Sequence, residues 1–222
     1  ILYNKGADIN HRDVDDITPL MWAARNGQYA AVETLLSLGA SMNVRDKSGK
    51  TALIWAATMG HEGVANLLIT KGANLDIQDN ESFTALTTAA KNGFPGIADK
   101  LIKSKATPNS TDKQGRSSLW YAADVGSRSM VLLLLDRGAS INIKDKLKQT
   151  PLMRAARNGH DDIVKLLIKK GAEIDIITKK GNTALIFAAA SGHELIAKQL
   201  LDAGANINHT NTYDNSALLV AS

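Results

Sequence analysis

An all-α solenoid with short β-hairpins is the fold class that the sequence predicts, because two landmarks recur along it at one fixed interval. Two landmarks that keep the same phase along the whole chain indicate stacked copies of one helix-turn-helix-hairpin repeat. The first landmark is Thr or Ser, at Thr18, Thr51, Thr84, Ser117, Thr150, Thr183 and Ser216. The second landmark is a Gly-Ala pair with one Lys substitution, at Gly6-Ala7, Gly39-Ala40, Gly72-Ala73, Lys105-Ala106, Gly138-Ala139, Gly171-Ala172 and Gly204-Ala205.

The repeats follow one another without a low-complexity linker, so we expect a single solenoid domain over residues 1–222. Residues 1–17 end one repeat and residues 216–222 begin another. Because both ends fall inside a repeat, we interpret the sequence as a piece of a longer array. The six full repeats span residues 18–50, 51–83, 84–116, 117–149, 150–182 and 183–215.

The fifth full repeat shows where each element should begin and end. Thr150 is a suitable N-cap, and Pro151 fits the first helical position, where an N–H would have no partner. Gly159 should end this first helix in a left-handed conformation. A second helix is then expected over about 160–169, and residues 174–182 should form the hairpin.

One repeat, 84–116, departs from the others. Lys105 stands where the other repeats carry a Gly that should adopt positive φ, and a side chain with a Cβ is disfavoured there. Pro108 removes a donor from the hairpin, and Thr87-Thr88 reduces the apolar content of the first helix. A tolerated defect and a flexible joint both fit these substitutions.

The pattern resembles the ankyrin-repeat family over the whole chain, and the interval from Thr18 to Thr51 matches the period of about 33 residues that is typical of that family. The resemblance also rests on Thr-Pro-Leu at residues 18–20 and 150–152, the alanine pair 155–156, Asn-Gly-His at 158–160 and Gly-Ala at 171–172. It implies an ankyrin-repeat solenoid that binds a partner protein in a concave groove.

The chain departs from the family at one motif position in every repeat. The family carries a His after Thr-Pro-Leu, so we expect its polar bracing to be lost and apolar packing to take its place. The residues at this position are Met21, Ile54, Thr87, Trp120, Met153, Ile186 and Leu219.

Catalytic and metal-binding motifs are absent from the sequence, so we expect no enzymatic activity, no cofactor and no metal. There is no Cys to form disulfides or thiolate zinc sites, and no glycine-rich phosphate-binding or nucleophile motif. His61, His160 and His193 each precede an acidic residue at the same inter-helix turn, and we interpret them as structural turn residues. An Asn that recurs at one hairpin position is expected to bond local backbone. It occurs at Asn10, Asn43, Asn109, Asn142 and Asn208.

Recognition is expected on the first helices and hairpin tips, because exposed positions there differ between repeats while buried positions do not. By the resemblance, this face lines the groove. Its N-terminal part is predicted to be apolar and its C-terminal part basic, with ten Lys or Arg against five Asp or Glu over residues 144–180. The predicted partner-binding residues are Trp22, Arg25, Trp55, Met59, Phe83, Lys113, Arg116, Tyr121, Lys146, Arg154, Arg157, Lys179, Lys180 and Phe187.

The predicted function is protein–protein recognition, with a partner that has an acidic and an apolar section, in an intracellular and cytoplasmic setting. No apolar run approaches the ~20 residues of a membrane span. Two alternatives stay open. The chain could be a regulatory or targeting segment of a larger enzyme, channel or secreted bacterial effector. It could also bind an anionic non-protein ligand such as a nucleic acid or nucleotide, although a net charge of +4 does not establish this.

Overall fold

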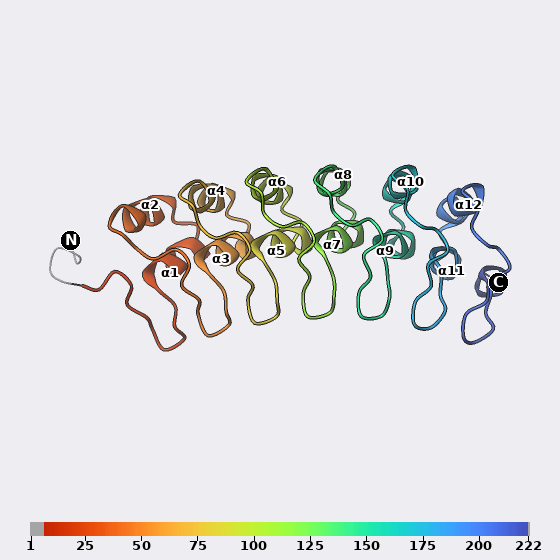
Figure 1. Cartoon of the computed structure of the whole chain (residues 1–222), viewed down its shortest axis with the longest axis horizontal. Helices are drawn as coiled ribbons and strands as arrows, with labels where there is room; N and C mark the ends of the chain where they lie inside the picture. Colours follow the sequence, from red (N-terminus) through yellow and green to blue (C-terminus); the bar gives the residue numbers. More distant parts are fainter. Residues whose placement is uncertain (1–6, 222) are drawn as a thin grey trace. The chain divides into compact units, whose positions relative to one another are not determined.

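The structure, a computed structural model, describes residues 7–221, which form thirteen short helices (Figure 1). Gly6 of the first Gly-Ala landmark lies outside the described residues. None of the described helices combines the length and apolarity of a membrane span. The helices are α1 (Pro19–Arg25), α2 (Tyr29–Ser37), α3 (Ala52–Met59), α4 (Glu62–Thr70), α5 (Ala85–Lys91), α6 (Pro95–Lys103), α7 (Ser118–Asp124), α8 (Arg128–Asp136), α9 (Pro151–Asn158), α10 (Asp161–Lys169), α11 (Ala184–Ala190), α12 (Glu194–Asp202) and α13 (Ala217–Val220).

The chain divides into two compact units, residues 1–113 and 114–222, with the boundary in the hairpin of the repeat 84–116. Within the N-terminal unit, α1, α3 and α5 pack in sequence, as do α2, α4 and α6. Within the C-terminal unit, α7, α9, α11 and α13 form one such row, and α8, α10 and α12 form the other. In each unit the hairpins extend from the row of first helices, on the side away from the second helices (Figure 1).

The core of each repeat lies between its two helices and the helices of the next repeat. In α3, Leu53, Ala56 and Ala57 are at most 1% exposed, and small alanines at such positions let neighbouring helices approach closely. The position that carries His in the family is apolar and at most 4% exposed in most repeats, for example at Met21 and Ile54. Apolar packing therefore replaces the polar bracing there, as predicted.

The predicted helix ends are confirmed in the fifth full repeat. The Thr150 hydroxyl accepts a hydrogen bond from the Met153 N–H at 3.3 Å, and Pro151 is the first residue of α9. Gly159 ends α9 with φ of 79°, in the left-handed region that favours glycine. The second helix, α10, begins one residue later than predicted.

The hairpins differ from the β-hairpins predicted from the sequence. Within residues 7–221, bridge residues outside the helices are confined to Thr111 and Ser117 and to the isolated pair of Thr210 with Ser216. Hairpin-tip donors bond to the preceding repeat, as the Lys47 N–H does to the Asp15 carbonyl at 3.0 Å. The same bond joins Asn80 to Ser48, Lys113 to Glu81, Lys146 to Gln114, Lys179 to Leu147 and Thr212 to Lys180.

Asn10, Asn43 and Asn142 of the recurrent hairpin Asn bond to another repeat, so the prediction of local backbone bonds is wrong at these three positions. Each side-chain oxygen accepts a hydrogen bond from a backbone N–H 31 residues further along the chain. The Asn10 oxygen accepts from the Ser41 N–H at 2.8 Å, the Asn43 oxygen from the Asn74 N–H at 2.9 Å, and the Asn142 oxygen from the Glu173 N–H at 3.0 Å.

The repeat 84–116 has a polar brace at Thr87 that was not predicted from the sequence. Thr87 is fully buried, its hydroxyl accepts from the Thr84 N–H at 2.8 Å, and it lies 3.1 Å from the Thr84 carbonyl, to which it donates. These bonds offset the loss of an apolar group at this position. Lys105 adopts φ of 71°, as predicted.

We therefore predict that Lys105→Gly raises the free energy of unfolding by about 0.5–1 kcal/mol, because glycine adopts positive φ without a Cβ penalty. Urea denaturation measures the change. The control is Lys103→Gly, which replaces the last residue of α6 and should lower stability. A Lys105→Gly variant no more stable than wild type would contradict the proposed strain.

Candidate functional site

The inner face, which we define as the surface of the first helices and hairpins, carries alternating aromatic rings and cations in the N-terminal unit. The Arg25 guanidinium carbon lies 5.4 Å from the centroid of the Trp22 ring and 4.7 Å from that of Trp55. The Lys50 ammonium lies 4.2 Å from the Trp55 centroid. Such cation–π contacts hold the cations over the ring faces. The predicted apolar section is therefore a mixed aromatic and basic surface.

Hydrogen bonds to hairpin carboxylates fix both indoles. The Trp22 Nε1–H donates to Asp13 at 3.1 Å, and the Trp55 Nε1–H donates to Asp46 at 2.8 Å. Asp46 also accepts from the backbone N–H of Lys50 at 2.9 Å. These carboxylates were not predicted from the sequence, although an Asp recurs at this hairpin position in successive repeats, at Asp13, Asp46, Asp79, Asp112 and Asp145.

The rest of the inner face in the N-terminal unit carries the exposed side chain of Met59 and two more cations, Lys91 and Lys113, each with a partner. Met59 is 48% exposed, and the Lys91 ammonium lies 4.5 Å from the centroid of the Phe83 ring. The Lys113 ammonium lies 3.5 Å from the Glu81 carboxylate, and both side chains are more than half exposed. An exposed pair of this kind contributes little to stability, so a partner can displace it at small cost.

Tyr121 differs from its predicted place on the binding surface, because it is only 3% exposed. Its ring packs edge-on against Trp120, with the centroids 5.2 Å apart, and the Arg116 guanidinium carbon lies 5.2 Å from its centroid. The tyrosine ring thus belongs to the core of the C-terminal unit, and Arg116 covers it.

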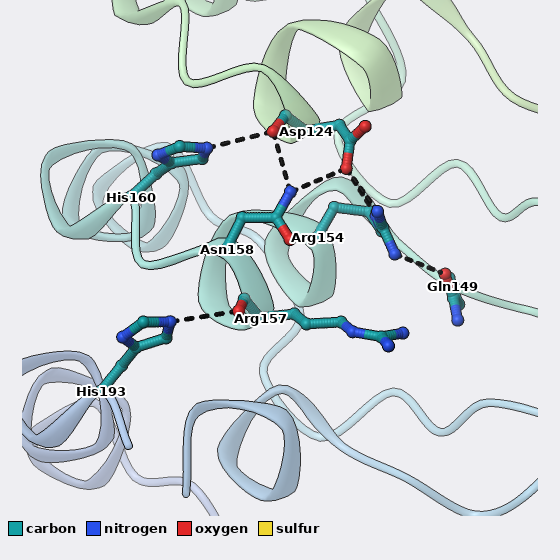
Figure 2. A network of polar contacts seen from close by, with 7 residues as sticks. All are labelled: Asp124, Gln149, Arg154, Arg157, Asn158, His160 and His193. Carbon is teal, nitrogen blue, oxygen red and sulfur yellow. Dashed lines mark hydrogen bonds and ion pairs between the residues drawn. The ribbon is translucent and has the colours of Figure 1, made fainter. Parts of the chain in front are cut away.

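Arg154 holds two repeats together, which limits its availability to a partner. Figure 2 shows its guanidinium at Asp124, with Nε 2.9 Å from the carboxylate. The Asn158 amide donates to the same carboxylate at 2.8 Å and to the Asp124 carbonyl at 2.9 Å. The Arg154 guanidinium carbon also lies 4.7 Å from the centroid of the Trp120 ring. The side chain of Arg154 is 18% exposed and that of Asp124 25%.

The three turn histidines have the structural role that was predicted for them. His160 Nε2 lies 3.0 Å from the Asp124 carbonyl oxygen, and His193 Nε2 lies 3.1 Å from that of Arg157 (Figure 2). Each ring also lies against a glycine of the preceding repeat: a Cβ on Gly159 would approach His193 to 2.8 Å. Within the described part of the chain, no group of His, Asp and Glu could hold a metal ion.

Four of the predicted partner-binding residues in the C-terminal unit are exposed basic side chains without an acidic partner. Among residues 7–221, no ion pair within 4.0 Å involves any of them. Arg157 and Lys180 approach the rings of Phe187 at 5.6 Å and Tyr213 at 5.8 Å. The four residues are Lys146, Arg157, Lys179 and Lys180, all of which were predicted partner-binding residues.

The net charge is also confined to the C-terminal unit. Residues 114–222 contain 14 Lys or Arg and 10 Asp or Glu, whereas residues 1–113 contain 12 of each. The N-terminal unit is therefore neutral, and the C-terminal unit carries the whole charge of +4. The two halves of the predicted surface differ in net charge, but both present aromatic rings beneath cations.

Comparison with known proteins gives one family and two similar solved structures. The sequence model of that family, described as ankyrin repeats in three copies, matches residues 1–79, 63–145 and 141–211. The crystal structure of the ankyrin repeat domain of Bcl-3, a member of the IkappaB protein family, aligns with a TM-score of 0.81 and 28% identity over 94% of this chain and 95% of that chain. Human ASB11 ankyrin repeat domain aligns with a TM-score of 0.81 and 26% identity, over 93% of this chain and 92% of that chain. No curated protein matches.

We predict that Asp13 titrates below its ordinary pKa of 3.8, because the Ile17 N–H donates to its carboxylate. Burial opposes this shift, while the Asp15 and Trp22 donors and the charge of His11 add to it. A lowered pKa stabilises the fold above pH 3.8, and this contribution is lost as the pH falls through the folded-state pKa. Carboxyl NMR titration measures the midpoint. Trp22→Phe should raise it only partway towards 3.8, whereas a wild-type midpoint at or above 3.8 contradicts the prediction.

A second prediction separates Arg154 from Arg157. Arg154→Ala should lower the free energy of unfolding by about 1.5 kcal/mol, since it leaves a half-buried Asp124 without its charge-assisted bond. Arg157→Ala should stay within about 0.5 kcal/mol of wild type, because its side chain is exposed. Thermal or urea denaturation of the two variants tests the difference. Equal stability would mean that the Asp124 ion pair contributes nothing.

Proposed function

Because the chain belongs to the ankyrin-repeat family, whose domains generally act as protein–protein interaction modules, we propose that it binds a partner protein through its inner face. The observation that carries the proposal is the exposed basic cluster of the C-terminal unit, defined as Lys146, Arg157, Lys179 and Lys180. Cations that no carboxylate within residues 7–221 pairs with favour a partner that supplies Asp or Glu.

The N-terminal unit supports the same function with a different set of contacts. Trp22 is 45% exposed and Met59 is 48% exposed, and Trp and Arg are the residue types most enriched at binding hot spots. The hydrogen bond from Trp22 to Asp13 fixes its ring before binding, which lowers the entropy lost on association. We therefore propose that this unit contacts apolar side chains of the partner.

The proposed role is recognition rather than catalysis. In homologues the ankyrin-repeat fold is a non-catalytic interaction scaffold. The ordered side chains of the inner face form ion pairs, cation–π contacts and hydrogen bonds between repeats. Its arginines and lysines supply charge and hydrogen-bond donors, which is what a binding surface needs.

The test is affinity capture from the native cell with three forms of the protein. Arg157→Glu reverses a charge within the basic cluster, and Lys169→Glu makes the same change on α10, a second helix. Proteins captured by wild type and by Lys169→Glu should be lost with Arg157→Glu, and the loss should be greater at low salt.

Circular dichroism and thermal denaturation show that each variant is folded before capture. If Lys169→Glu abolishes capture and Arg157→Glu does not, the second helices bind the partner and the assignment to the inner face is wrong.

A further inference from the structure

Two adjoining pockets lie on the inner face of the C-terminal unit. The upstream pocket, of about 310 Å³, is lined by residues that include Arg116, Trp120, Lys146 and Arg154. The downstream pocket, of about 520 Å³, is lined by residues that include Lys179, Lys180 and Phe187. Leu147, Gln149 and Arg157 line both, so the two pockets are continuous along the row of hairpins.

The charge of both pockets favours an anion. The downstream pocket is lined by three cations, Arg157, Lys179 and Lys180, and by no carboxylate. The upstream pocket contains one carboxylate, that of Asp145. This carboxylate accepts bonds from the N–H groups of Leu147 and Gln149, each at 2.8 Å, so it is committed to its own hairpin.

Two side chains distinguish the upstream pocket and its border with the downstream pocket. Trp120 lines the upstream pocket and is 4% exposed, and its buried indole N–H has no hydrogen-bond acceptor among the described residues. Leu147 is 57% exposed at a hairpin tip and borders both pockets. A ligand that spans the pockets must therefore pass an apolar side chain between two basic regions.

A protein segment fits this surface better than a nucleic acid does. Single-stranded nucleic acids bind through bases stacked on accessible aromatic rings, as well as through phosphates. Here the guanidinium of Arg154 lies over Trp120 and that of Arg157 over Phe187, while Tyr121 is buried. Cations therefore occupy the ring faces on which bases would stack.

We propose that the two pockets bind an extended acidic segment of a partner protein, with one carboxylate in each pocket and an apolar side chain at Leu147. Neighbouring helices pack about 8–10 Å apart, and an extended chain in the polyproline II conformation rises about 3.1 Å per residue with three residues per turn, so side chains three residues apart lie on the same side. The two carboxylates are therefore about three residues apart in the partner. This inference rests on the proposed function and adds the chemistry and spacing of the segment that is bound.

The experiment is an NMR titration of the full chain with two synthetic peptides of equal composition. The matched peptide, Gly-Glu-Ala-Leu-Glu-Gly, has its two acids three residues apart, and the rearranged peptide, Gly-Glu-Glu-Ala-Leu-Gly, has them adjacent. The matched peptide should bind roughly tenfold more tightly, the factor expected when one charge-assisted hydrogen bond is lost. It should shift the indole signal of Trp120, which lines the upstream pocket, and not those of Trp22 and Trp55 in the other unit.

Charge reversal assigns each carboxylate to its pocket. Lys146→Glu in the upstream pocket and Lys180→Glu in the downstream pocket should each weaken the matched peptide roughly tenfold. Lys169→Glu on α10 is the matched control and should change the affinity by less than about twofold. Each variant is first shown to unfold at the same urea concentration as wild type.

Three outcomes would overturn the inference: equal affinity for the two peptides, tighter binding of random single-stranded DNA than of the matched peptide, or an indole shift at Trp22 or Trp55 alone. Failure of the proposed function gives a different result, because captured cellular partners would then be insensitive to Arg157→Glu. If capture depends on Arg157 while peptide spacing has no effect, recognition by the inner face stands and the spacing is wrong.

Discussion

A single repeat cannot satisfy its own backbone, and this constraint governs the rest of the structure. The N–H at each hairpin tip donates to a carbonyl of the preceding repeat, and a hairpin Asn or Asp accepts from the N–H of the following one. Turn histidines add a third bond across the same boundary. These bonds between neighbours add to bonds within a hairpin, such as that from the Asp46 N–H to the Lys50 carbonyl at 3.0 Å, and together they hold the hairpins in shape.

Because each repeat depends on bonds to its neighbours, the side chains of the inner face fall into two classes. Arg154 and Asp124 bond across a repeat boundary, and Arg116 covers Tyr121, so these residues maintain the stack. Lys146, Arg157, Lys179 and Lys180 contact no carboxylate within the described residues and can change without loosening it. A surface built in this way can acquire a new partner through substitutions in the second class, while the first class preserves the fold.

The sequence was sufficient for the local structure, because helix caps and turns depend on residues close together in the chain. Thr150 and Gly159 behave as their residue types predict, and Lys105 adopts the positive φ that its position in the repeat predicts. Contacts between repeats were harder to predict from the sequence, since a regular period shows that the copies stack but not which atoms come into contact. The Asn43 bond to Asn74 and the burial of Tyr121 both depend on that stacking register. The exposed cations were predicted from the sequence, whereas the contacts of Arg157 with Phe187 and of Lys180 with Tyr213 depend on the fold.

The close contact between Gly159 and His193 has a consequence for how such an array could be recombined. A ring from one repeat occupies the space that a Cβ on the preceding repeat would need, and Gly126 and His160 form the same pair one repeat earlier. A crossover anywhere between Gly126 and His160 leaves the glycine with the residue that the other parent carries at the histidine position. A transplanted segment that carries a turn His should therefore follow a repeat with a turn Gly. Arrays should tolerate exchange at boundaries that keep this Gly-His pair and reject it where another residue replaces the Gly.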